Sequence, residues 1–290
     1  MIVTLYIDKI KLYVITLKLT IDLILKKYNV FLLQYHLKRL AVLHKYRDET
    51  KNAEVFIQDL HNLLLANSSA VNLKRIGSNF DGGYFIYDHL LKPDLLITAG
   101  IGKNCDFENS LAGLGTSVVA LDPTITHLPR NHANFEWIKK YLSTKDDKKN
   151  MSLSTLMKLH SNPEKSIFLK IDIEGDEYKI IRDIPVNRDY LWQIIIEFHD
   201  LHKILNPTFR QSLKSCFEHL FQAYSIISIN SNNFADVNIF GQSICPDVLE
   251  ISFINNKFLQ NRGVTDLQYI SPKTCNNPSL PVTFGYPRFF

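Results

Sequence analysis

Four side chains suited to proton transfer follow two apolar runs of the sequence. Asp172 and Glu174 come as the first run ends, and Glu197 and His199 end the second. Carboxylates and imidazoles can accept a proton from a reacting group, and they are also ligands for divalent cations. In an α/β sheet, residues at the carboxyl ends of neighbouring strands share one crevice, so we expect these four side chains to lie together.

The residues that follow Glu174 fit a turn into a helix. Gly175 allows the backbone to turn sharply or to approach a ligand closely. Asp176 and Glu177 would stabilise the first turn of a following helix through its dipole. This structural role does not account for Asp172, which still lies inside the apolar run.

A second candidate site begins earlier, where a Gly-x-Gly pair follows another apolar run. Gly100 and Gly102 permit a tight turn and a close approach of a ligand to the backbone. Asp122 ends the next apolar run, 20 residues after Gly102, where an acid can accept hydrogen bonds from both hydroxyls of a ribose. Together these residues predict a site for a cofactor that contains adenosine.

The residues after the glycines favour S-adenosylmethionine over NAD. NAD binding prefers Gly or Ala three residues after the second glycine, where the helix N-terminus meets the pyrophosphate, but this position is Cys105. The nearby Asp106 and Glu108 would repel a pyrophosphate, whereas they would tolerate a sulfonium and an amino group. We therefore predict S-adenosylmethionine as the cofactor.

Short apolar runs alternate with turns and helical stretches beyond residue 70, which is typical of an α/β fold with a mostly parallel sheet. Seven strands are expected, at 94–100, 116–122, 134–142, 166–173, 192–199, 223–230 and 248–255. Helices are expected between them, at 107–115, 152–160, 177–184 and 207–221. We predict one main domain at 71–290 and a mainly helical extension at 1–70.

The two ends of the chain have weaker patterns. Leucine spacing predicts helices at 31–43 and 53–65, whereas residues 10–25 fit a strand and a helix equally well. No segment has the roughly 20 uninterrupted apolar residues that would span a bilayer, and lysines interrupt the run that a secretory signal would need. The asparagine-rich stretch at 255–277 is expected to be a loop.

The distribution of charge limits the kinds of molecule that the protein is expected to bind. The 290-residue chain has a net charge of +4, and residues 1–50 hold nine Lys/Arg against four Asp/Glu, so the basic excess lies in the extension. A solvated helical face explains this excess, and so does peripheral contact with an anionic membrane surface or a polyanionic partner. The rest of the chain is slightly acidic, which argues against a nucleic-acid substrate.

The four cysteines are far apart and include no CxxC pair, so the sequence suggests no disulfide framework. Because disulfides are typical of oxidising compartments, we expect a cytoplasmic protein.

Several segments resemble the FkbM-like class I methyltransferases. LKIDIEGDEYKII at 169–181 is similar to the strand-four signature of that family, and IIIEFHDL at 194–201 is similar to its strand-five motif. The remaining similar segments are SLSTLMKLH at 152–160, RIGSNFDGGYFIYD at 75–88, ITAGIGKNCDFENSLAGLG at 97–115 and VVALDPT at 118–124. The last three resemble a branch of the family that has a DGGY segment ahead of the cofactor loop.

The resemblance implies a Rossmann-like seven-stranded sheet with helices on both faces and with the last strand antiparallel. It also implies S-adenosylmethionine as methyl donor and a hydroxyl oxygen of a sugar or related metabolite as acceptor. Asp81 and Tyr84, in the DGGY segment, would close over the cofactor. From the residues alone, this segment is equally well a tight turn that enters a strand.

One position departs from the family pattern. Many members have an acid at the start of the glycine loop, where this sequence has Thr98 or Ala99. Asp106 or Glu108 would then bind the amino group of the methionine.

Methyl transfer to a hydroxyl requires an aligned acceptor and a base that removes its proton. Asp172 is the best-placed base, with Glu174 beside it, and our hypothesis is that Asp172 and either Glu197 or His199 flank the acceptor hydroxyl. The same four side chains also suit Mg²⁺ or Mn²⁺, and the sequence does not separate a metal-assisted reaction from a metal-free base.

Two other functions fit the same residues. A nucleotide-sugar glycosyltransferase could use Asp172 and Glu174 as a metal-binding pair of acids. A non-catalytic binding module could retain the methyltransferase fold with the altered glycine loop at Thr98.

Overall fold

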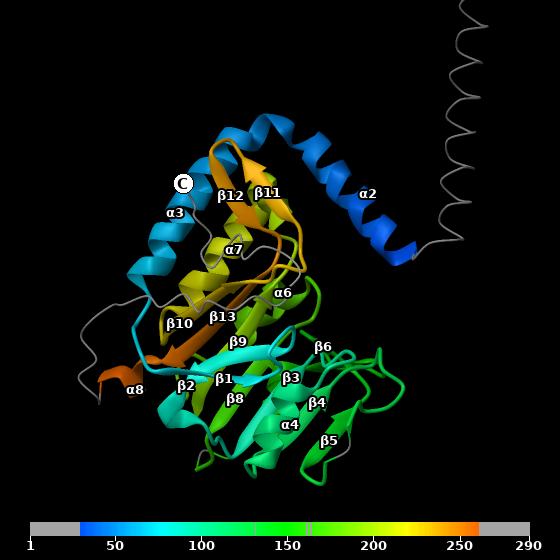
Figure 1. Ribbon diagram of the computed structural model, residues 1–290, viewed down its shortest axis with the longest axis vertical. Helices are drawn as coiled ribbons and strands as arrows, with labels where there is room; N and C mark the ends of the chain where they lie inside the picture. Colours follow the sequence, from blue (N-terminus) through cyan, green and yellow to red (C-terminus); the bar gives the residue numbers. More distant parts are fainter. Residues whose placement is uncertain (1–29, 131, 161, 163, 261–290) are drawn as a thin grey trace, which may run out of the picture. The chain divides into compact units, whose positions relative to one another are not determined.

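The structure is a computed structural model that describes residues 30–130, 132–160, 162 and 164–260 (Figure 1). The chain forms two compact units, Met1–Arg47 and Asp48–Phe290. The segment 10–25, whose sequence fits both a strand and a helix, lies outside the described residues.

Most of the described part of the first unit is helix α2, Val30–Lys45. This agrees with the helix that leucine spacing predicts at 31–43. His44 and Lys45 lie in its last turn, where positive charge interacts favourably with the helix dipole.

The second unit is built on a seven-stranded sheet with the order β10-β13-β9-β8-β3-β4-β5. The strands are β3 (Leu95–Ala99), β4 (Ser117–Leu121), β5 (Phe135–Ile138), β8 (Ile167–Ile171), β9 (Leu191–Phe198), β10 (Tyr224–Ser231) and β13 (Leu249–Asn255). Each corresponds to one of the seven predicted strands, so the α/β fold class is confirmed.

The sheet is mostly parallel. Strands β3, β4, β5, β8 and β9 pair in parallel, whereas β13 runs antiparallel to both β9 and β10. The predicted antiparallel last strand is therefore confirmed. From β3 the chain continues to β4 on one side and returns to β8 on the other, so the order reverses at β3. In open α/β sheets, ligands bind beyond the carboxyl ends of the strands at such a switch point.

The central strands of the sheet are buried on both faces. Every residue of β8, Ile167–Ile171, is buried, as expected for a strand that is covered on both sides. On one face, Leu96 and Phe168 belong to an apolar core that also contains Phe107 and Leu111 of helix α4 (Asp106–Gly113). The same core includes residues of the hairpin that strands β1 (Leu73–Gly77) and β2 (Gly83–Tyr87) form.

The remaining helices of this unit agree with most of the predicted segments. They are α3 (Thr50–Ala66), α5 (Leu153–His160), α6 (Glu177–Ile180), α7 (Pro207–Leu220) and α8 (Asn256–Gln260), with 3₁₀ turns η2 (Asp88–Leu90), η3 (Ile181–Asp183) and η4 (Leu201–Leu205). Helix α3, which the sequence analysis assigned to the N-terminal extension, lies in the second unit. The predicted helix at 177–184 is divided between α6 and η3, and α8 begins inside the segment that was expected to be loop.

Two pairs of short strands were not predicted as such. Strands β6 (Tyr141–Ser143) and β7 (Asn150–Ser152) pair in parallel, and β11 (Val237–Phe240) and β12 (Ser243–Pro246) form a hairpin. The predicted strand at 134–142 covers both β5 and the first residues of β6. Among the helices that the structure describes, none is both long enough and apolar enough to cross a membrane.

Candidate active site

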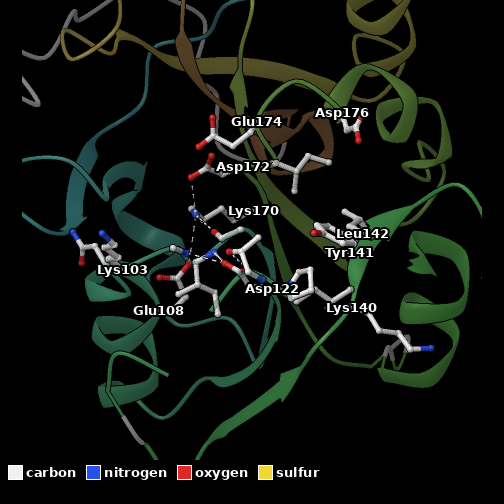
Figure 2. Close-up of a pocket in the computed structure, with 18 of the residues that line it drawn as sticks. Lys103, Glu108, Asp122, Lys140, Tyr141, Leu142, Lys170, Asp172, Glu174 and Asp176 are labelled. Atoms are coloured by element: carbon white, nitrogen blue, oxygen red, sulfur yellow. Dashed lines mark hydrogen bonds and ion pairs between the residues drawn. The ribbon is translucent and has the colours of Figure 1, made fainter. Parts of the chain in front are cut away.

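A cavity of about 580 Å³ lies beyond the carboxyl ends of β3, β4 and β8. Its volume is in the range of small-molecule and cofactor sites. The predicted site residues that line it are Asp81, Tyr84, Gly100, Gly102, Glu108, Asp122, Asp172 and Glu174. Figure 2 shows the carboxylates of Asp172 and Glu174 side by side. The structure thus brings the predicted cofactor loop and the predicted acidic motif to one cavity.

Two glycines shape the floor of the cavity in different ways. Gly100 has φ +81°, and a Cβ built there would lie 1.6 Å from the carbonyl oxygen of Asp172, so the loop after β3 and the end of β8 touch through backbone. Gly102 has φ +58°, and a Cβ there would meet nothing within 4 Å. Since Gly102 also lines the cavity, its missing side chain leaves room for a ligand against the backbone.

Asp122, at the end of β4, fixes the glycine loop. Its Oδ2 accepts hydrogen bonds from the backbone N–H groups of Ile101 (3.0 Å) and Gly102 (2.9 Å), and its Oδ1 accepts from the N–H (2.7 Å) and hydroxyl (2.6 Å) of Thr124. Burial alone would raise the pKa of Asp122, but the hydrogen bonds from Thr124, Gly102 and Ile101 outweigh it and lower the pKa. The role of Asp122 as a ribose acceptor stays a prediction, and in this structure its oxygens hold the glycine loop.

Lys170 lies at the centre of the site, although it is not among the predicted site residues. Its ammonium donates to the carbonyl oxygen of Gly100 (2.9 Å) and lies 3.4 Å from Asp172 Oδ2 and 3.6 Å from Glu108 Oε1. Figure 2 shows it between these two carboxylates. Burial lowers the pKa of Lys170, but Glu108 and Asp172 more than offset this and raise it, so the side chain is a buried cation.

The two acids of helix α4 lie in different places. Glu108 is buried, lines the cavity and accepts a hydrogen bond from Thr98 Oγ1 (2.9 Å). Its carboxylate therefore stands next to Thr98, at the strand end where the resemblance implies an acid. Asp106 is not among the cavity-lining residues that the structure describes, and it pairs with Arg130 at 3.5 Å on the surface. Of the two candidates for an amino-group ligand, only Glu108 faces the cavity.

The DGGY segment forms the turn of the β1–β2 hairpin and the start of β2. Gly82 has φ +80°, which provides the tight turn, and Asp81 and Tyr84 both line the cavity. Tyr84 is buried, packs edge-on against Phe107 at 5.2 Å, and places its hydroxyl 3.4 Å from Asp172 Oδ2. Both readings of this segment are therefore compatible: it is a turn, and its side chains contribute to the cavity wall.

The predicted catalytic residues surround the imidazole of His199. Its Nε2 lies 3.8 Å from Asp172 Oδ1, 3.5 Å from Glu174 Oε2 and 3.9 Å from Glu197 Oε1. Glu174 has a left-handed backbone with φ +57°, which turns its side chain next to Asp172. The four side chains that the sequence predicted to meet are thus together.

Glu177 belongs to the same cluster, although its position in the sequence predicts a helix-starting acid within the motif that resembles the family signature. It is fully buried, and it accepts hydrogen bonds from the backbone N–H groups of Gly175 (2.9 Å) and His199 (2.7 Å). Burial lowers the pKa of His199, but Glu177, Glu197 and Asp172 outweigh it and raise the pKa to about 10. Asp176, in contrast, is exposed and pairs with Lys179.

Glu197 lies behind this cluster rather than on the described cavity wall. It is buried and accepts a hydrogen bond from Asn232 Nδ2 at 2.9 Å. Burial and the neighbouring Asp172 and Glu250 raise the pKa of Glu197 well above its usual value. Because Asp172 lines the cavity and Glu197 lies behind it, Asp172 is better placed than Glu197 to accept a proton there.

Comparisons with known proteins agree with this arrangement. The family model described as "Methyltransferase FkbM domain" matches residues 86–222, which include the glycine loop, Asp122, the acidic motif and His199. No match was found among curated proteins.

Several solved structures are similar at low identity. The fibrillarin/Nop5p complex is 9% identical, with 56% of this chain and 73% of that chain covered and a TM-score of 0.37. The 23S rRNA methyltransferase ErmE is 13% identical over 57% of this chain and 63% of that chain (TM-score 0.35). The 1,6-didemethyltoxoflavin-N1-methyltransferase of Burkholderia thailandensis, with S-adenosylhomocysteine bound, is 10% identical over 77% and 88% of the two chains (TM-score 0.31). These likenesses are too distant to indicate a substrate.

The expected resemblance is confirmed by the family match, and the motif segments at 97–115, 118–124, 152–160, 169–181 and 194–201 all fall inside the matched region. Residues 86–222 of this chain therefore match the family model of the methyltransferase FkbM domain.

Proposed function

We propose that the protein transfers a methyl group from S-adenosylmethionine to a hydroxyl oxygen, most directly that of a sugar or a related hydroxylated metabolite. The observation that supports this most is the shared cavity: the glycine loop after β3, Asp122 after β4 and Asp172 after β8 all face it within a methyltransferase domain. A cofactor held by the loop would lie next to the proposed base.

The residues of the cavity fit this cofactor. Gly102 leaves open space along the loop backbone, and Leu121 and Leu142 supply apolar surface for a base. Glu108 offers a buried carboxylate for the amino group, a role that we transfer from the acid that many relatives have at the loop start. S-adenosylmethionine, when bound, supplies a methyl group that is activated by a positively charged sulfur.

The charge of the cavity also favours a cationic cofactor. Six carboxylate residues and three lysines line it. The excess of carboxylates would repel the pyrophosphate of NAD or of a nucleotide sugar, whereas it would stabilise a sulfonium. This difference argues against the glycosyltransferase alternative.

Asp172 is the residue that we assign as general base. Its Oδ2 faces Lys170 and Tyr84, at 3.4 Å from each, whereas its Oδ1 faces His199 at 3.8 Å. Lys170 and Tyr84 hold the carboxylate in place, and its cavity side can accept the proton of an acceptor hydroxyl. A positioned base of this kind contributes about 10²–10⁴-fold to rate.

Ligand-dependent stability tests the proposal. The melting temperature of the protein would be measured with S-adenosylmethionine, S-adenosylhomocysteine, NAD or a uridine-diphosphate sugar, because only a ligand that prefers the native state stabilises it. We expect stabilisation by the first two ligands alone, at about 3 kcal/mol when the ligand is at 100 times its Kd. Stabilisation by the uridine-diphosphate sugar alone would favour the glycosyltransferase instead. Release of S-adenosylhomocysteine with a panel of hydroxylated metabolites would then separate an enzyme from a binding module.

A further inference from the structure

The imidazole of His199 has an unusual environment for a buried side chain. His199 is 9% exposed, and its Nδ1 is buried without a hydrogen-bond partner among the described residues. Its Nε2 points at three carboxylates, those of Asp172, Glu174 and Glu197, at 3.5–3.9 Å. These separations exceed the usual 2.7–3.2 Å of an N–H···O hydrogen bond.

The separations suit groups that share a cation. Two ligands that are each about 2.1 Å from one ion stand roughly 3 Å apart at right angles and about 4 Å apart when opposite. One ligand atom each from Asp172, Glu174 and His199 lies within 4.8 Å of the other two. Three donor atoms therefore converge without touching, and small side-chain rotations would bring them onto one ion.

A carboxylate behind the imidazole provides a second observation, independent of the acidic cluster. Histidines that bind metals usually donate their other ring N–H to a carboxylate, which fixes the tautomer. Glu177 Oε1 lies 3.5 Å from His199 Nδ1, and the same oxygen accepts a hydrogen bond from the backbone N–H of His199. With Glu177 fully buried and directed at Nδ1, a dication that displaces the Nε2 proton would bind the lone pair of Nε2 on the cavity side.

We infer that Asp172, Glu174 and His199 bind one divalent cation at the edge of the cavity. Two carboxylates suit Mg²⁺ and Mn²⁺, and the imidazole shifts the preference toward a first-row transition ion, so Mn²⁺ is the best probe. The excess negative charge of the cluster acts in the same direction, because a dication would offset the repulsion among its carboxylates.

The role of this cation in catalysis rests on the proposed function. A cation at this position would take the acceptor hydroxyl as a further ligand and lower its pKa, so Asp172 would still suffice as the base although binding the cation makes its carboxylate less basic. Acceptors with two adjacent hydroxyls, which can chelate an ion, would be favoured over single alcohols.

Direct binding of Mn²⁺ to the full-length chain tests the inference without cofactor or substrate. After treatment with EDTA and dialysis, calorimetry should show one Mn²⁺ per chain, and electron spin-echo spectroscopy should show coupling to a nitrogen nucleus. Glu174→Gln and His199→Asn should each weaken Mn²⁺ binding at least about tenfold, and the second should abolish the nitrogen coupling. Asp176→Asn removes a carboxylate from the same loop, but that carboxylate pairs with Lys179 and lies apart from the cluster, so Mn²⁺ affinity should stay within about twofold.

Two results would overturn the inference: absence of Mn²⁺ binding, or equal Mn²⁺ affinity in wild type and in Glu174→Gln. Glu174 is exposed, so this variant should fold even where His199→Asn does not. The response of the melting temperature to S-adenosylhomocysteine, measured on the same preparations, tests the proposed function separately: a protein that binds S-adenosylhomocysteine but not Mn²⁺ contradicts only the cation site.

Discussion

Asp122 and Asp172 follow the two strands that flank β3, and both side chains line one cavity. Their common position depends on the reversal of strand order at β3, because β4 and β8 pair with opposite edges of this strand. The first acid fixes the glycine loop and the second faces the open space, and these are the binding side and the reactive side of the proposed site. Four consequences can be measured.

The first concerns three glycines that differ in what a methyl group would meet. Gly100→Ala should prevent folding or cost more than about 4 kcal/mol, because its Cβ would overlap the Asp172 carbonyl. Gly102→Ala should fold with a cost of about 1–2 kcal/mol for its positive φ, and it should bind S-adenosylhomocysteine less tightly because its Cβ enters the cavity. Gly113→Ala, in α4 with open space around it, is the matched control and should be neutral or stabilising. Denaturant unfolding and calorimetry would measure both quantities; equal stability of the Gly100 and Gly102 variants would contradict the account.

The second concerns the buried ammonium group of Lys170. Lys170→Met leaves the buried Glu108 and the half-buried Asp172 without their partner and should lower the free energy of unfolding by about 3–5 kcal/mol. Adding Glu108→Gln removes one of the two uncompensated charges and should recover part of the loss. Urea unfolding of the single and double variants would show this, and a loss below about 1 kcal/mol in Lys170→Met would mean that the lysine is not the counter-ion of the site.

The third concerns the proposed base. Asp172→Asn should reduce turnover by about 10²–10⁴-fold, whereas its affinity for S-adenosylhomocysteine should change little, because an amide cannot accept the proton of the hydroxyl. Release of S-adenosylhomocysteine with an accepted hydroxylated metabolite is the assay. Asp183→Asn, an exposed acid in η3, controls for loss of one negative charge and should keep wild-type turnover. Full activity in Asp172→Asn together with normal cofactor binding would exclude this residue as the base.

The fourth concerns acid stability. Hydrogen bonds lower the pKa of Asp122 in the folded protein despite its burial, so its carboxylate contributes stability above its unfolded pKa of about 3.9 and loses this contribution as pH falls through the folded value. Asp122→Asn should therefore be about 1–3 kcal/mol less stable than wild type at pH 7, and the difference should shrink below about pH 4. Unfolding curves from pH 7 to pH 2 would reveal it. A constant difference over this range would show that the ionised carboxylate is not what holds the loop.

Much of the sheet could be predicted from the sequence because its strands are short apolar runs buried on both faces. The run at 166–173 is an example, since β8 is buried throughout. The short pairs β6–β7 and β11–β12 lack this signal: in β11, the polar Asn238 is buried while Ile239 is 71% exposed, the reverse of the usual pattern. Division of the 177–184 segment into α6 and η3 likewise depends on local geometry that helix propensity does not specify.

The acidic side of the site could be predicted because its residues end adjacent strands, as Asp172 and His199 do. Lys170 was missed because a lysine inside an apolar run resembles an interruption of the strand. Its position two residues before Asp172 was an available signal, since alternate residues of a strand share a face. Glu177 was missed for a different reason: an acid at a helix start has an ordinary explanation, and only the fold shows that it is buried against His199.

The structure of the protein in complex with S-adenosylhomocysteine is the most direct test of the central claim. We expect the ligand in the cavity between the loop of Gly100 and Gly102 and the end of β8, with its sulfur facing Asp172. A ligand bound elsewhere on the chain, or a cavity that stays unoccupied at saturating concentration, would contradict the proposed methyltransferase site.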